Sequence, residues 1–228
     1  MKVKYSALVS QMSGKLNGSV ASFNRGGAYL RNKVTPVNPQ TTFQQANRNK
    51  LTSFSQQWSA LTAAERLSWN NSVTAWAKTD IFGDVRNPSG INLFVKINVR
   101  LATAGQAVLT TAPSPASAGS ISTLTIVADE SASTLIATFT ASGVTAAETI
   151  IVEACEQVSA GTDFVKNKFR VLTTFVGSTA SPLALGALYE ARFGNMIAGR
   201  KIFVRIKSID NATGSVSLPF VASTIVVA

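Results

Sequence analysis

The sequence comprises 228 residues, of which 46% are hydrophobic, with no histidine, a single cysteine and a formal net charge of +10. The absence of histidine removes the commonest general base, the commonest neutral metal ligand and every Ser–His or Cys–His nucleophile pair. Cys155 alone cannot form an intramolecular disulfide or a multi-thiolate metal site, and the sequence has no glycine-rich phosphate loop, so we expect a protein that is not an enzyme, with no catalytic residue, metal or cofactor.

The first fifty residues carry eight Lys or Arg side chains and no acid, which creates a positive potential that favours an anionic partner. Asn17 and Gly18 favour a two-residue hairpin turn, because both tolerate positive φ. This stretch holds too few large apolar residues to be stable alone, so we expect it to pack on the helices or on a partner chain. Residues 4–35 therefore predict a small β meander, with strands at 5–10, 19–24 and 28–34.

An extended connector is predicted over residues 35–41, because Pro36 and Pro39 hold the residues before them in extended geometry. Thr62 and Glu65 have the spacing of a capping box, which marks the start of a helix. The loop before Thr62 is short, so the first two helices are expected to form an antiparallel pair. Three helices are predicted, at about 43–59, at 62–78, and from the turn at 87–90 to Gly105.

Residues 112–120 have the composition of a linker, and the charge balance changes at the same place. Residues 1–110 hold 13 Lys or Arg against 3 acids, whereas residues 111–228 hold 8 of each. The two signals predict a basic module at 1–111 and a second domain at 121–228. The second domain has period-two patterns typical of strands, at 122–127, 134–140, 149–154, 168–175, 188–193, 202–209 and 215–227.

Seven short strands separated by turn-prone clusters are typical of a Greek-key sandwich. The hairpin over 204–218 resembles the last hairpin of fibronectin type III domains, whereas the Cys–Trp–Cys pattern of immunoglobulin domains is absent. The predicted fold class is therefore α+β. It combines an N-terminal β meander and a small three-helix module with an all-β Greek-key sandwich of the immunoglobulin or fibronectin III kind.

Several residues invite a chemical role but have a plainer explanation. Cys155 lies in an apolar strand pattern, which predicts a small buried hydrophobe. Asp80 and Asp84 lack the register of a calcium loop, so we expect a solvated loop. The three tryptophans could stack on bases, but at their spacing core packing is favoured; they are Trp58, Trp69 and Trp76.

The basic stretch permits three interpretations, which stay open at this point. Its cations dock on an acidic partner protein, or they bind nucleic acid beside aromatic and glycine residues, or they form a solvated face. Docking is the favoured interpretation, because the cations are scattered over a predicted sheet. The candidate docking residues are Lys15, Arg25, Tyr29, Arg31, Lys33, Asn38 and Arg48.

Five motifs, together with Gln45, Arg48, Glu65, Arg66, Trp69 and Asn70, resemble a family of uncharacterised proteins from tailed phages and prophages. The motifs are SGKLNGSV at 13–20, RGGAYLR at 25–31, VNPQT at 37–41, WSALT at 58–62 and SGINLF at 89–94. The resemblance covers residues 13–105 and implies a virion component. It does not indicate whether that component belongs to the capsid, the neck or the tail.

These observations predict a structural protein of a phage virion, made in the host cytoplasm without a signal peptide. The expected partners are other virion proteins and copies of the same chain, with neither a membrane nor a small-molecule substrate. Nucleic acid is the second candidate partner. A third hypothesis is a host-surface adhesin whose sandwich loops bind a receptor or glycan.

Overall fold

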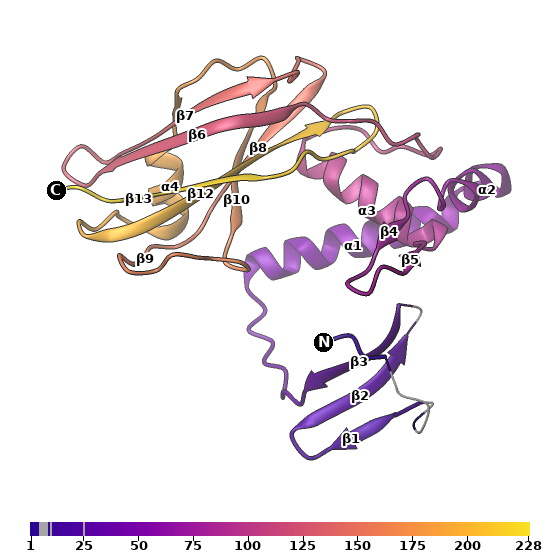
Figure 1. Cartoon of the computed structure of the whole chain (residues 1–228). Helices are drawn as coiled ribbons and strands as arrows, with labels where there is room; N and C mark the ends of the chain where they lie inside the picture. Colours follow the sequence, from indigo (N-terminus) through magenta and orange to yellow (C-terminus); the bar gives the residue numbers. More distant parts are fainter. Residues whose placement is uncertain (5–8, 10, 25) are drawn as a thin grey trace.

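A computed structural model describes residues 1–4, 9, 11–24 and 26–228. The chain forms a small sheet at the N-terminus, a helical part, and a larger β part that contains one further helix (Figure 1). Helices and antiparallel sheets are therefore both present, as predicted. An extended segment after the first sheet leads to the longest helix, and the small sheet lies apart from the larger β part (Figure 1).

The N-terminal sheet consists of β1 (Gly14–Leu16), β2 (Ser19–Asn24) and β3 (Gly27–Asn32), in the order β1-β2-β3. Asn17 has a φ of 49°, which confirms the predicted hairpin turn. Residues 1–3 lie along the free edge of β3, where the Val3 amide donates to the carbonyl of Ala28. The predicted strand at 5–10 falls mostly on residues 5–8 and 10, which lie outside the described part of the chain.

The helical part consists of α1 (Thr42–Ala60), α2 (Ala63–Asn71) and α3 (Gly90–Thr103). The capping box at Thr62 and Glu65 is confirmed, since each side chain bonds the backbone N–H of the other residue. A short hairpin of β4 (Lys78–Thr79) and β5 (Val85–Arg86) connects α2 to α3.

Two predictions about the helices were wrong. The second helix ends at Asn71 rather than at 78, because the short polar side chains from Asn70 to Ser72 compete for backbone hydrogen bonds, and the Ser72 hydroxyl donates to the Ser68 carbonyl. The first two helices both pack mainly on α3 rather than on each other. Since α3 carries the most apolar face of the three, it attracts both; that face comprises Leu93, Phe94, Ile97 and Leu101, all fully buried.

The tryptophans pack in the helical core, as predicted. Trp69 is 0% exposed, and its indole N–H donates to the Thr110 carbonyl over 2.6 Å. The rings of Trp58 and Trp69 lie 5.6 and 5.3 Å from the ring of Phe94. The indole N–H of Trp76 donates to the carbonyl of Pro113, within the predicted linker. These side chains therefore join the helices to the segment that follows them.

The β part contains two larger antiparallel sheets, both contributing to one core. That core includes Ile126 and Leu135 from one sheet and Val152 and Val204 from the other. One sheet has the order β11-β7-β6, with β6 (Ser120–Asp129), β7 (Thr134–Ser142) and β11 (Leu183–Ala184). The other sheet has the order β10-β8-β12-β13, and its strands are β8 (Glu148–Ala154), β10 (Arg170–Val176), β12 (Arg200–Asp210) and β13 (Phe220–Ile225). The short strand β9 (Val158–Ser159) also pairs with β12.

The predicted strand at 188–193 is wrong, because this segment lies in the helix α4 (Gly186–Phe193). Its alternating pattern is short, and residues such as Ala, Leu, Glu and Arg favour a helix. The helical form brings Tyr189 and Phe193 onto one face, with ring centroids 5.0 Å apart. It also buries Tyr189, whose hydroxyl donates to the Cys155 carbonyl over 2.9 Å.

The predicted linker at 112–120 makes hydrogen bonds to both parts of the chain. The Ala112 amide donates to the Ser68 hydroxyl of α2, and the Ala116 amide donates to the Ser215 hydroxyl of the β part. The end of α3 also contacts the β part directly, where Ala104 packs with Ile151 and Ile209. The boundary near residue 115 stays a prediction, but the segments on its two sides are in contact.

Candidate interaction site

The N-terminal sheet presents a row of basic side chains on one face. Lys15 pairs with Val20 across β1 and β2, and Val20 pairs with Arg31 across β2 and β3. Residues directly opposite in antiparallel strands share a face, so Lys15 and Arg31 lie on the same face. Tyr29, two residues before Arg31, lies on that face as well. Three of the predicted docking residues therefore share one surface of the sheet.

The same sheet exposes large apolar side chains. Leu16 and Phe23 are 65% and 61% exposed. They lie on the face opposite the basic row, because neighbouring residues of a strand point to opposite faces. Val34 and Val37, in the segment after β3, are also exposed. A few exposed apolar residues are ordinary, but here they gather on a part of the chain that has little core of its own.

The remaining docking candidates lie along the connector and α1. Lys33 is exposed at the end of the sheet, where its amide donates to the Gly18 carbonyl. The Arg48 guanidinium of α1 donates to the side-chain oxygen of Asn38 over 2.7 Å, which ties the connector to the helix. All residues from 33 to 41 are exposed. Arg25 lies outside the described residues, so the structure does not place it.

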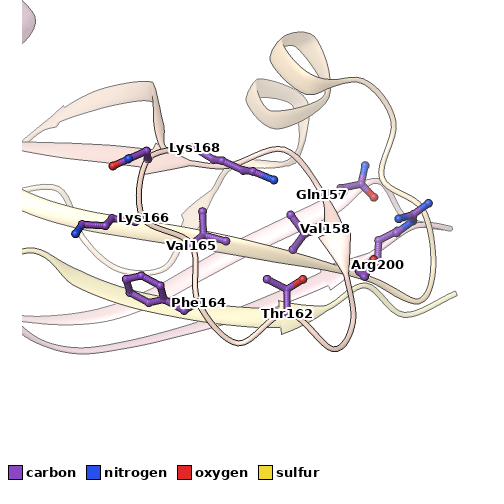
Figure 2. A pocket seen from close by; sticks show the side chains of 10 residues that line it. Gln157, Val158, Thr162, Phe164, Val165, Lys166, Lys168 and Arg200 are labelled. Carbon is purple, nitrogen blue, oxygen red and sulfur yellow. The ribbon is translucent and has the colours of Figure 1, made fainter. Parts of the chain in front are cut away.

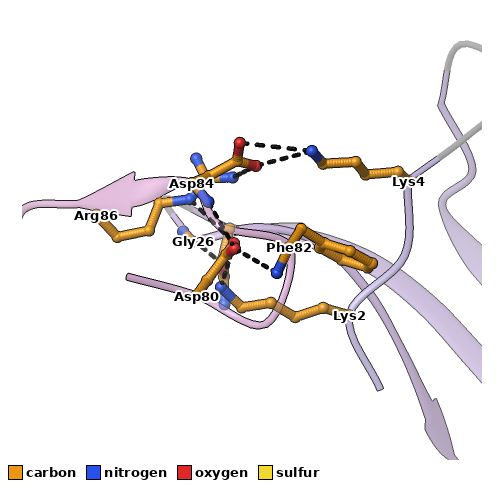
Figure 3. A network of polar contacts seen from close by, with 8 residues as sticks. Lys2, Lys4, Gly26, Asp80, Phe82, Asp84 and Arg86 are labelled. Atoms are coloured by element: carbon orange, nitrogen blue, oxygen red, sulfur yellow. Dashed lines mark hydrogen bonds and ion pairs between the residues drawn. The ribbon is translucent and has the colours of Figure 1, made fainter. Parts of the chain in front are cut away.

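Two N-terminal lysines bind acids of the same chain, which the sequence reasoning missed. The Lys2 ammonium lies 3.1 Å from the Asp80 carboxylate, and Lys4 lies 3.2 Å from Asp84 (Figure 3). Arg86 lies within 3.4 Å of both carboxylates (Figure 3). We call these five residues the Asp80 cluster. It joins the start of the chain to the β4–β5 hairpin.

The expectation of a solvated loop was wrong for Asp80, whose side chain is only 5% exposed. One Asp80 oxygen accepts hydrogen bonds from the amides of Phe82 and Asp84, at 2.8 and 3.1 Å, which fixes the turn between β4 and β5. Desolvation on its own would raise the pKa of Asp80, but the Phe82 amide and the Lys2 ammonium outweigh it and lower this pKa to about 2. The signal in the sequence was the isolation of the two acids, four residues apart, in a basic module.

A hollow lies in the β part, next to the loop that follows β9. It has a volume of about 520 Å³ and is bordered by Phe164, Lys166, Lys168 and Arg200 (Figure 2). Gln157 also borders it, but its side chain bonds the backbone of Asn195 and Ile197 and so has a structural role. The hollow offers cations and one exposed aromatic ring.

Groups that could support covalent or metal chemistry are sparse in the part of the chain that the structure describes. Cys155 is fully buried beside Phe203 and Val165, as predicted, and burial raises the pKa of its thiol. Among the described residues, no group of three or more Asp, Glu or Cys side chains could hold a metal ion. Within the same residues, no helix is both long and apolar enough to span a membrane. The N-terminal sheet and the hollow beside β9 offer cationic and apolar surfaces that can bind partners.

Comparisons with known proteins add little to this geometry. No protein-family model matches the chain, and no curated protein matches it. The resemblance to the tailed-phage family therefore stays a prediction. Among solved structures, a Fn3-like protein from Clostridium thermocellum matches with a TM-score of 0.30 and 18% sequence identity, over 49% of this chain and 91% of that one. Similarity at this level does not establish a shared fold.

Proposed function

We propose that the chain is a structural component of a phage virion that binds a neighbouring protein through its N-terminal sheet. The observation that carries this proposal is the set of exposed cationic and apolar side chains on that sheet. It exposes Lys15 and Arg31 on one face and Leu16 and Phe23 on the other, and it continues into a connector whose residues 33–41 are all exposed. A sheet with a cationic face and exposed apolar side chains on its other face suits a protein partner that is acidic where it meets the cations.

The β part fits the proposal as a Greek-key sandwich of the fibronectin III or immunoglobulin kind. The first two strands, β6 and β7, pair with each other, and β7 also pairs with β11, whereas β8, β10, β12 and β13 form the other sheet. The chain crosses between the two sheets after β7, after β10 and after β11, and such crossings support the Greek-key proposal. We propose that this domain projects from the particle or packs between copies.

Charge variants of the N-terminal sheet test the docking claim. The variant Lys15→Gln/Arg31→Gln/Lys33→Gln removes three cations that have no acid partner among the described residues. We expect reduced co-sedimentation with particles, and deletion of residues 1–40 should abolish incorporation. The matched control Arg66→Gln/Lys166→Gln/Lys168→Gln removes the same charge from exposed positions elsewhere. Normal incorporation of the deletion variant would refute the docking role.

Nucleic acid is the second candidate partner, favoured by the placement of Tyr29 on the same face as Lys15 and Arg31. Binding of this kind weakens steeply with salt, in proportion to the number of phosphate contacts. A gel-shift titration with DNA and RNA at low salt distinguishes the two functions. A complex that forms at low salt, dissolves at high salt and is lost in the triple sheet variant would favour nucleic acid over protein docking.

A further inference from the structure

A groove of about 770 Å³ lies between the beginning of α1 and the β part, and we call it the α1 groove. Figure 1 shows this end of α1 beside the lower end of β10, whose first residues line the groove. One wall comes from α1, with Phe43 and Lys50, and the other from the β part, with Phe169, Arg170 and Arg192. The volume falls within the range of sites that hold a small ligand or a few side chains, about 300–1,000 Å³.

The α1 groove is cationic because the acid that lines it, Glu153, is already paired with cations. Glu153 is the one acid among the lining residues, and it lies 2.5 Å from Arg205 and 2.8 Å from Lys207. Lys50, Arg170 and Arg192 form no ion pair with any described residue, and the first turn of α1 contains no acid. Three unpaired cations therefore border a groove that has no free carboxylate.

Arg170 and Arg192 line the same groove despite their like charges. Burial lowers the pKa of Arg192, and the repulsion from Arg170 lowers it further. Arg170 is anchored by hydrogen bonds to the carbonyls of Asn167 and Phe169, at 3.2 and 2.9 Å. Such a pair gains stability from an anion between or beside its members.

The aromatic walls of the α1 groove distinguish between kinds of anion. The guanidinium of Arg192 lies 4.0 Å from the ring centroid of Phe43, and that of Arg205 lies 4.3 Å from the ring centroid of Phe169. Each ring therefore has one face covered by a cation, which leaves less surface for the base stacking that single-stranded nucleic acids use. Planar guanidiniums beside apolar rings suit carboxylates carried on a peptide.

We propose that the α1 groove binds an acidic peptide segment of a partner protein, with Lys50, Arg170 and Arg192 contacting its carboxylates. The groove lies on a different part of the chain from the N-terminal sheet, so this inference does not depend on the docking role of that sheet. The occupant is identified by charge complementarity, since the groove supplies cations and apolar walls but no free acid.

The test is fluorescence anisotropy of the full chain with a labelled short peptide that alternates Glu and Ala. We expect saturable binding at low salt, weakened about tenfold or more by Arg170→Gln/Arg192→Gln, since two charge-assisted contacts are lost. Lys50→Gln should weaken binding to a smaller degree, and because Lys50 is exposed on α1 this variant leaves the β part intact. The control Lys166→Gln/Lys168→Gln removes the same charge from exposed positions outside the α1 groove and should bind like the parent chain.

Competition experiments complete the test. A neutral Gln–Ala peptide, single-stranded DNA and inorganic phosphate should each displace the acidic peptide less effectively than unlabelled acidic peptide does. No binding at low salt, or equal binding by the parent chain and both groove variants, would overturn the proposal. Tighter binding of DNA than of the peptide, or displacement by phosphate at equal concentration, would also overturn it, because the groove would then select another anion. Circular dichroism of each variant verifies that it is folded.

Discussion

At Asp80, a nearly buried carboxylate carries two kinds of interaction at once. It bonds the amides of its own turn, and it pairs with Lys2 and Arg86. The local half of this arrangement follows from the tendency of Asp to bond the backbone two residues ahead. The long-range half spans 78 residues, from Lys2 to Asp80, and no local pattern indicates it. Cys155 differs from Asp80, because its apolar neighbours in the sequence were enough to predict its burial.

The depressed pKa of Asp80 predicts a dependence of stability on pH. Its folded value of about 2 lies below its ordinary value of 3.8, so the unfolded state binds more protons between these values. This contribution to stability is therefore present above about pH 3.8 and is lost as the pH falls towards 2. Urea denaturation measured across this range should show the loss in the parent chain and a smaller one in Asp80→Asn.

Hydrogen exchange provides a site-specific readout of the same variant. In Asp80→Asn the amides of Val3 and Leu30, which bond across the edge of β3, should exchange faster because Lys2 loses its partner. The control is Asp163→Asn, since Asp163 is 95% exposed and its pairing with Lys201 should contribute little. Unchanged exchange at Val3 and Leu30 in Asp80→Asn would contradict a role for this carboxylate in holding the N-terminal strand.

Elements with a clear periodic pattern and a recognisable end were predictable, and short ones were not. The helix α3 has both, with buried residues at helical spacing and a Ser89 hydroxyl that accepts from the Asn92 amide. The helix α4 is short and lacks a side-chain cap, so its alternating residues predicted a strand. Burial of Tyr189 against the β part determines its form, because packing overrides weak local preference in so short a segment.

The capping box of α2 gives a prediction at the element scale. Thr62→Ala removes the hydroxyl that accepts from the Glu65 amide, so the free energy of unfolding should fall by about 1 kcal/mol. Urea denaturation followed by tryptophan fluorescence reports on this helix, since Trp69 belongs to α2 and is buried in the helical core. The control is Thr52→Ala, an exposed position inside α1, where alanine should be neutral or slightly stabilising. Equal effects of the two substitutions would argue against a capping contribution.

At the scale of the whole molecule, the contact between α3 and the β part joins two regions that differ in charge and in periodicity. Arg100 of α3 donates to the Gly214 carbonyl over 3.2 Å, and Ala104 covers Ile151 and Ile209. Gly214 has a φ of 66°, and a Cβ there would lie 2.9 Å from a methyl group of Ile97. A glycine is required at this position both for its backbone conformation and for the close approach of α3.

Gly214→Ala tests this contact. It should lower the free energy of unfolding by more than about 1 kcal/mol, because backbone strain and the clash with Ile97 add together. The matched control is Gly105→Ala, where φ is also positive, at 75°, but a Cβ would meet no atom within 4 Å. Denaturant midpoints of the two variants separate the packing cost from the strain. Equal midpoints would mean that close packing at Gly214 does not matter.

Removal of the helical part is a second test at this scale. A fragment of residues 121–228 exposes the apolar surface around Ile151 and Ile209 that Ala104 covers in the whole chain. We therefore expect the fragment to unfold at a lower denaturant concentration than the β part within the full chain. Identical midpoints would show that the two regions are thermodynamically independent, as a flexible linker at 112–120 would imply.

Features that depend on neighbours along the chain were predictable from the sequence. These include the hairpin at Asn17, the capping box at Thr62, the alternating strands of the β part and the basic character of the first fifty residues. Hydrophobic periodicity and backbone preference act over a few residues, so the pattern carries them directly.

Which distant groups meet becomes clear from the three-dimensional packing. It paired Lys2 with Asp80, placed α4 beneath Cys155, brought α3 against Gly214 and formed the α1 groove from segments more than a hundred residues apart. These contacts form when elements that are far apart in the chain pack against each other. The physical reason is that long-range pairing leaves no local periodicity, so Asp80 and Asp84 were visible in the sequence but their pairing with Lys2 and Lys4 was not.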